Sequence, residues 1–61
     1  MGKRRRRFVA RAEAGHGWRV WDTFFGRWWG PWLSSQPDEL VVELNGERRL
    51  EHLNRLIQKY R

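Results

Sequence analysis

The sequence predicts a small α+β domain, because its hydrophobic period changes from that of strands to that of helices halfway along the chain. Apolar and polar side chains alternate near residues 7–13 and 18–23, and tryptophans recur in 27–30, as is typical of strands. Leucines then recur at helical spacing toward the C-terminus. We therefore expect a small antiparallel sheet of two or three strands, packed on one face by two short helices.

The first predicted strand, near residues 7–13, alternates between two faces. Phe8, Ala10 and Ala12 face one side, whereas Val9 and Arg11 face the other. The glycine-containing segment 14–17 then predicts a turn, because glycine adopts positive φ without strain.

The second and third predicted strands, 18–23 and 27–30, form a hairpin. Residues 23–26 read as its loop, with Gly26 in the left-handed position that closes a type I turn with a bulge. Gly30 and Pro31 are expected to stop the third strand, since proline cannot donate to a sheet ladder.

The first predicted helix covers residues 36–44. Ser35 is expected at its N-cap, with Asp38 placed for a capping box, and Gly46 is expected just past its end. An alternative remains open at this stage: residues 40–44 could form a strand that continues into a hairpin turn at 45–46.

The second predicted helix covers residues 47–60 and has an apolar stripe at helical spacing. The stripe consists of Leu50, Leu53, Leu56, Ile57 and Tyr60. The neutral, helical half of the chain is thus the expected scaffold that covers one face of the sheet.

The net charge of +6 lies entirely in the first thirty residues, whereas residues 31–61 contain five basic and five acidic side chains. Residues 1–6 predict a disordered basic arm, and residues 7–61 a single domain. A half-chain this basic attracts polyanions over roughly 8–10 Å at physiological salt. The charge distribution therefore indicates an anionic or acidic partner.

The residue inventory argues against an enzyme. The chain has no cysteine, and neither of its two histidines lies near a motif that would pair it with a nucleophile. We expect no cofactor and no metal, because the histidines are far apart in sequence. No apolar run of about 18 residues is present, so we expect no membrane span and a cytoplasmic location. A monomer is expected over an oligomer.

Arginines interleaved with tryptophans predict a binding face on the sheet. The helices can cover only one face, so Trp21 and one of Trp28 and Trp29 are expected to be partly exposed beside arginines. The candidate nucleic-acid-binding residues are Lys3, Arg4, Arg5, Arg6, Arg7, Arg11, Arg19, Arg27, Trp21, Trp28 and Trp29. Alternatively, the tryptophans pack against arginine stems and form a second small core.

The stretch Trp18-Arg19-Val20-Trp21-Asp22-Thr23, followed by Gly26-Arg27-Trp28-Trp29-Gly30, resembles a hairpin in small uncharacterised proteins encoded by phages and prophages. The similarity extends over residues 8–61. It implies a phage origin, where small proteins often bind nucleic acid or host proteins, and it assigns no site residues.

Two functions follow from these observations. The first is a non-enzymatic, sequence-tolerant nucleic-acid-binding protein that uses the basic arm and the Arg/Trp face. The alternative is a protein-interaction module that binds and inhibits or redirects an acidic host protein, with Phe24 and Phe25 at the hairpin tip as contact residues. Binding to a membrane surface is less well supported, since the C-terminal helix is mixed in charge and its apolar stripe is needed for the core.

Overall fold

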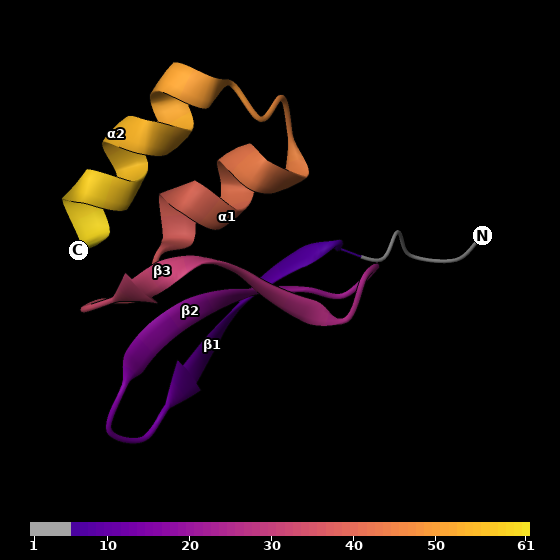
Figure 1. Ribbon diagram of the computed structural model, residues 1–61. Helices are drawn as coiled ribbons and strands as arrows, with labels where there is room; N and C mark the ends of the chain where they lie inside the picture. Colours follow the sequence, from indigo (N-terminus) through magenta and orange to yellow (C-terminus); the bar gives the residue numbers. More distant parts are fainter. Residues whose placement is uncertain (1–5) are drawn as a thin grey trace.

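Three antiparallel strands form one sheet, and two helices lie on one of its faces in the computed structural model (Figure 1). The structure describes residues 6–61, so most of the predicted basic arm lies outside the described residues. The elements in chain order are β1 (Phe8–Glu13), β2 (Gly17–Asp22), β3 (Arg27–Leu33), α1 (Asp38–Asn45) and α2 (Leu50–Tyr60). The predicted α+β class and its arrangement of sheet and helices are confirmed.

The strand order is β1-β2-β3, which puts β2 in the centre and leaves β1 and β3 as edges. In the β1–β2 pairing Ala10 lies opposite Val20, and in the β2–β3 pairing Trp21 lies opposite Trp28. Gly26 adopts a φ of 64°, and its amide donates to the Asp22 carbonyl, so the predicted left-handed residue closes the hairpin.

One buried cluster joins the sheet to the helices. Its members are Phe8, Val20, Leu33, Leu40, Val41, Leu44, Leu53 and Leu56. Trp18 and Trp29 are partly buried and pack against it. The predicted alternation therefore holds: Trp18 and Val20 lie on the helix-covered face, and this leaves Arg19 and Trp21 on the other.

The third strand runs three residues beyond the predicted stop. Gly30 adopts a φ of 76°, and the register between β2 and β3 shifts in this region. The shift leaves Gly30, Pro31 and Trp32 without direct partners between the pairs formed by Trp29 and Leu33. Because β3 is an edge strand, the missing proline amide removes no ladder bond, and the expected stop was wrong.

Residues 40–44 are helical, so the alternative strand is wrong. The predicted N-cap at Ser35 is also wrong, since the N-cap residue is Pro37 and no side chain caps α1 there. The Tyr60 hydroxyl of α2 instead accepts a hydrogen bond from the Glu39 amide at 3.1 Å. Tertiary contact thus replaces the local cap that the sequence pattern suggested.

The second helix begins at Leu50, three residues later than predicted. Arg48 has a φ of 55° and Arg49 is extended, so the chain cannot start the helix earlier. At its other end, the Ser34 hydroxyl donates to the carbonyls of Tyr60 and Arg61. Neither helix of the described part has the length and apolar character needed to cross a membrane.

Candidate functional site

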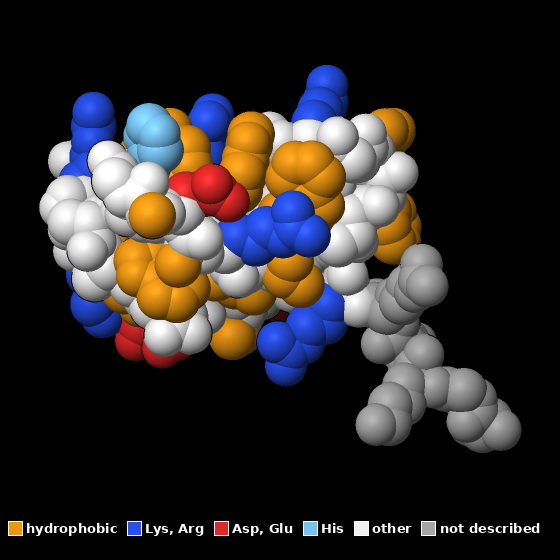
Figure 2. Space-filling view, turned by 90° about the horizontal axis from the view of Figure 1, so that it is seen from below, with side chains coloured by type: hydrophobic (Ala, Val, Ile, Leu, Met, Phe, Trp, Pro, Cys, Tyr) orange, Lys and Arg blue, Asp and Glu red, His pale blue; other side chains and the backbone are white. Residues whose placement is uncertain are grey.

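The sheet face opposite the helices carries apolar side chains with basic side chains among them (Figure 2). Strand alternation places on it the residues that do not point to the core. We define the open-face array as six of these, joined by ring contacts: Arg11, His16, Arg19, Trp21, Trp28 and Trp32. All three strands and the β1–β2 turn contribute to it.

The aromatic rings of the array form a continuous row. His16 stacks on Trp32 at 4.9 Å between ring centroids, and Trp32 lies 5.3 Å from Trp28. Trp28 in turn meets Trp21 edge-to-face at 5.1 Å. The three tryptophans are half-buried, so each is held by its neighbours while part of its ring faces solvent.

Two arginines stack on this row. The Arg19 guanidinium lies 5.6 Å from the Trp28 ring centroid and 5.2 Å from that of Trp32. Its Nε donates to the Gly30 carbonyl at 2.7 Å, which fixes its plane. Arg11 is exposed and lies 4.7 Å from the Trp21 ring centroid. The array therefore presents a row of aromatic rings with two cations stacked on it, and Arg19 is already oriented.

Trp32 and His16 are the two members of the array that were not among the predicted binding residues. Trp32 was omitted because the strand was expected to stop at Gly30, and His16 because it lies in the predicted turn 14–17. Trp29, by contrast, was a candidate, but it lies on the helix-covered face, 6.4 Å from the Phe8 ring. Continued alternation from Trp28 to Trp32 would have placed both rings on one face, since the two positions differ by an even number.

The β2–β3 hairpin tip is a second distinctive surface, adjoining the array. Phe24 and Phe25 are each 64% exposed, so both of the predicted contact residues reach solvent. The Arg7 guanidinium lies 5.4 Å from the Phe24 ring centroid and 4.9 Å from that of Phe25. The guanidinium of exposed Arg27 lies 5.3 Å from the Phe25 centroid. The tip is thus an apolar pair with arginines against it.

Asp22 makes this tip rigid. Its carboxylate is buried, accepts two bonds of 3.1 Å from Arg7, and accepts the amides of Phe24 and Phe25. The Arg7 guanidinium holds the pKa of Asp22 below its ordinary value, against the opposing effect of burial. Arg7, a predicted phosphate ligand, is therefore half-buried and already engaged in an ion pair with Asp22.

The remaining predicted cations divide into two groups. Arg6 is exposed, and its carbonyl accepts the Thr23 hydroxyl at 3.0 Å. The other three, Lys3, Arg4 and Arg5, lie outside the described residues. The structure thus brings together Arg11, Arg19, Trp21 and Trp28 of the predicted site.

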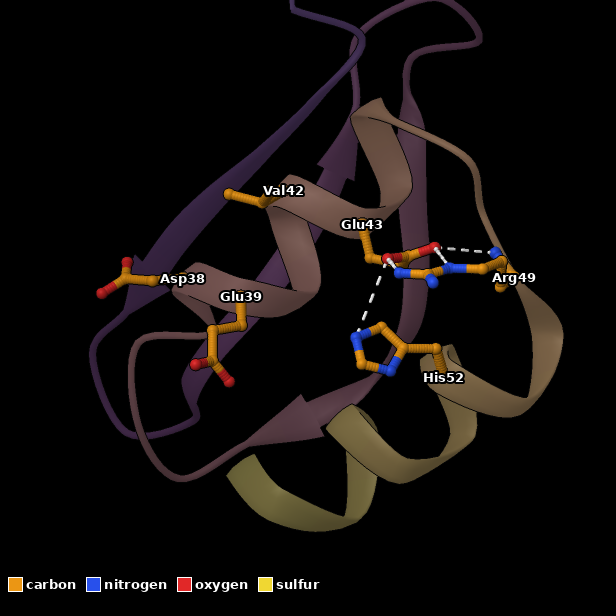
Figure 3. Close-up of a pocket in the computed structure, with 6 residues that line it drawn as sticks. All are labelled: Asp38, Glu39, Val42, Glu43, Arg49 and His52. Carbon is orange, nitrogen blue, oxygen red and sulfur yellow. Dashed lines mark hydrogen bonds and ion pairs between the residues drawn. The ribbon is translucent and has the colours of Figure 1, made fainter.

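A hollow between the helices lies away from the array (Figure 3). Its centre is the buried Glu43 carboxylate, which accepts three hydrogen bonds from Arg49, at 2.8 to 3.0 Å. These bonds lower the pKa of Glu43 to about 2. His52 Nε2 lies 3.8 Å from Glu43 Oε1. The Glu43–Arg49 pair fixes the α1–α2 connection, which is a structural role.

Among residues 6–61, no group of three or more His, Cys, Asp or Glu side chains is placed to hold a metal ion. Compared with protein-family models, curated proteins and solved structures, the chain matches none. The resemblance to phage-encoded proteins therefore stays a prediction.

Proposed function

We propose that this protein is a non-enzymatic, sequence-tolerant nucleic-acid-binding module, and that single strands are its preferred ligand. The observation that carries the proposal is the open-face array, in which a row of three tryptophans crosses the face with Arg11 and Arg19 stacked on it. Unpaired bases stack on aromatic side chains, whereas the bases of a duplex already stack on one another.

The arginines supply the backbone contacts. Arg11 and Arg27 are exposed and stack by one face only, so their outward N–H groups can donate to phosphate oxygens. Arg19 uses its Nε for Gly30, and its terminal nitrogens are left for a ligand. The N-terminal arm supplies four further cations, Lys3, Arg4, Arg5 and Arg6.

The tryptophans supply base contacts. Removal of one stacking aromatic costs about 1–3 kcal/mol per base in proteins of this kind. Trp28 lies in the middle of the row and touches both Trp21 and Trp32, so a strand crossing the face meets it whatever its direction. Stacking on rings uses no base edge, and binding should therefore be tolerant of sequence.

Fluorescence anisotropy with labelled single- and double-stranded oligonucleotides across a salt series tests this proposal. We expect micromolar binding to the single strand, weaker binding to the duplex, and affinity that falls linearly with salt on logarithmic axes. Absence of binding at about 50 mM salt, where the electrostatic attraction is strong, would refute it.

A charge-matched pair of variants locates the surface. Arg11→Ala and Arg55→Ala each remove one exposed cation, the first from the array and the second from α2. Arg11→Ala should lower the salt slope by about 0.7 for single strands, as expected for one lost phosphate contact. Arg55→Ala should change it much less. Equal effects would indicate a diffuse attraction to net charge rather than this face.

Protein binding is the second candidate function, because both hairpin-tip phenylalanines are exposed and rigidly held. Such an aromatic pair beside arginine is typical of an interface hot spot. Pull-down from nuclease-treated lysate tests this candidate, with Phe25→Ala against Val42→Ala, which is exposed on α1. A stoichiometric partner lost only with Phe25→Ala would favour it, and loss of all partners with nuclease would favour nucleic acid.

A further inference from the structure

The outer edge of β1 carries backbone groups that the sheet does not use. In an antiparallel pair, the N–H and C=O of alternate residues point to the partner strand and the others point away. The Phe8 amide donates to Asn45 Oδ1 at 2.9 Å, and Asn45 Nδ2 donates to the Phe8 carbonyl at 2.9 Å. Phe8 therefore points outward, and by alternation Ala10 and Ala12 do the same.

Asn45 satisfies the first of these outward positions, since its side-chain amide pairs with Phe8 as a neighbouring strand would. Among the hydrogen bonds that residues 6–61 make outside the β-ladders and helices, none involves the backbone of Ala10 or Ala12. Ala12 is exposed and Ala10 is half-buried. Two consecutive outward positions of the edge are thus open for a further strand.

We propose that β1 pairs antiparallel with β1 of a second copy of this chain, with Ala12 opposite Ala12 of that copy. In this register Arg11 lies opposite Glu13 of the second copy, and Glu13 opposite its Arg11. These cross-strand pairs of opposite charge occur twice by symmetry. The charge pattern of the edge is self-complementary in this register.

Neighbouring registers are less favourable. Centring the pairing on Arg11 would put the two Arg11 side chains directly opposite one another. Centring it on Ala10 would bring Ala12 of the second copy opposite Phe8, whose backbone groups Asn45 already holds. The register centred on Ala12 avoids both conflicts and pairs residues 11–13 of the two strands through the open backbone groups of Ala12, with Ala14 of the β1–β2 turn opposite Ala10.

The surroundings of Ala10 have room for the second copy. A hollow of about 340 Å³ lies beside Ala10, lined also by Val41 and Val42 of α1. In the proposed register, Ala14 and Gly15 of the second copy arrive at this hollow, and neither has a bulky side chain. The pairing therefore needs no large displacement of α1.

Pairing would extend the sheet to the order β3-β2-β1-β1-β2-β3 and join the two open-face arrays on one side. Arg11 of each copy lies at the junction. The inference stands on the backbone of β1 and does not depend on the proposed nucleic-acid binding, and it replaces the expectation of a monomer. Since so short a pairing buries little area, we expect a dissociation constant on the order of 0.1 mM.

Sedimentation equilibrium of the nucleic-acid-free protein tests the pairing in about 0.5 M salt, which screens the repulsion between two copies of net charge +6. The apparent mass should rise from 7.5 kDa toward twice that value between about 10 µM and about 1 mM. A mass that stays at 7.5 kDa throughout would overturn the proposal.

Two sets of variants test the register. At about 0.15 M salt, where exposed pairs are less screened, Glu13→Arg turns both cross-strand attractions into repulsions and should weaken association about tenfold, and Arg11→Glu combined with Glu13→Arg should restore it. Ala12→Pro removes an outward N–H that is not part of the β1–β2 ladder, whereas Ala12→Val retains it. Ala12→Pro should stay monomeric, with its fold checked by circular dichroism. Association unaffected by Glu13→Arg and Ala12→Pro would place the interface elsewhere.

Discussion

Gly17 is the position at which the smallest change should have the largest effect on the fold. It begins β2 with a φ of 101°, and a Cβ built there would lie 2.5 Å from the Leu33 carbonyl oxygen. Both features oppose a side chain, since the conformation is strained for L-residues and the space is filled by backbone. The contact belongs to the end of β3, which packs α2 against the sheet.

The control is Gly15 in the same turn, with a φ of 82° and no atom within 4 Å of a built Cβ. Gly15→Ala should therefore cost only the backbone strain, about 1–2 kcal/mol. Gly17→Ala adds an overlap that must displace β3, comparable with the overpacking of a core at about 1–3 kcal/mol. Its total of about 2–5 kcal/mol approaches the whole stability of a domain this small, roughly 3–5 kcal/mol.

Urea denaturation followed by tryptophan fluorescence measures both variants. Gly17→Ala should be largely unfolded even without urea, so that its curve lacks most of the folded baseline. Gly15→Ala should show a complete unfolding transition at a lower urea midpoint than the unaltered protein. If the two free energies of unfolding differ by less than about 0.5 kcal/mol, the close approach of Leu33 to Gly17 is not what constrains this turn.

Three further outcomes follow from particular contacts. Asn45→Ala should lower the free energy of unfolding by about 1–3 kcal/mol, because it leaves the Phe8 N–H and C=O without their partners; urea titration measures it. Arg49 lowers the pKa of Glu43 from 4.5 to about 2, so the stability that Glu43 contributes should be complete above about pH 4.5 and lost as the pH falls toward 2. In Glu43→Gln, the free energy of unfolding from urea titrations should change less between about pH 4.5 and pH 2 than it does in the unaltered protein. Tyr60→Phe should cost about 0.5–1.5 kcal/mol in thermal or urea unfolding, since the amide at the start of α1 loses its acceptor.

The sequence pattern predicts the elements of this fold because their causes are local. Alternation around Val20 and leucine spacing around Leu53 each depend on a few neighbouring residues, and both hold in the structure. The stop at Gly30 failed because the meaning of a proline in a strand depends on whether that strand is an edge, which is a property of the whole sheet.

The open-face array was predictable only in part for the same reason. Period two correctly separates Trp21 from Trp18 and also holds from Trp28 to Trp32, but Trp32 was missed because the strand was expected to stop before it. The engagement of Arg7 with Asp22 links residues fifteen positions apart and has no signature in either local segment. Charge counted along the chain could not distinguish this internal arginine from those that remain available.

That distinction between charge and geometry leads to a prediction about Arg19. Its guanidinium lies over the adjacent rings of Trp28 and Trp32 and is held by its bond to the Gly30 carbonyl, so little side-chain entropy is lost when it binds a phosphate. Arg19→Lys retains the charge but has no planar group to stack there. Under the proposed function, the variant should keep the salt slope of single-strand binding and lose about tenfold in affinity at every salt concentration. An unchanged affinity together with an unchanged slope would mean that Arg19 acts as a charge alone, and that the stacked order of the array is not what prepares the face for its ligand.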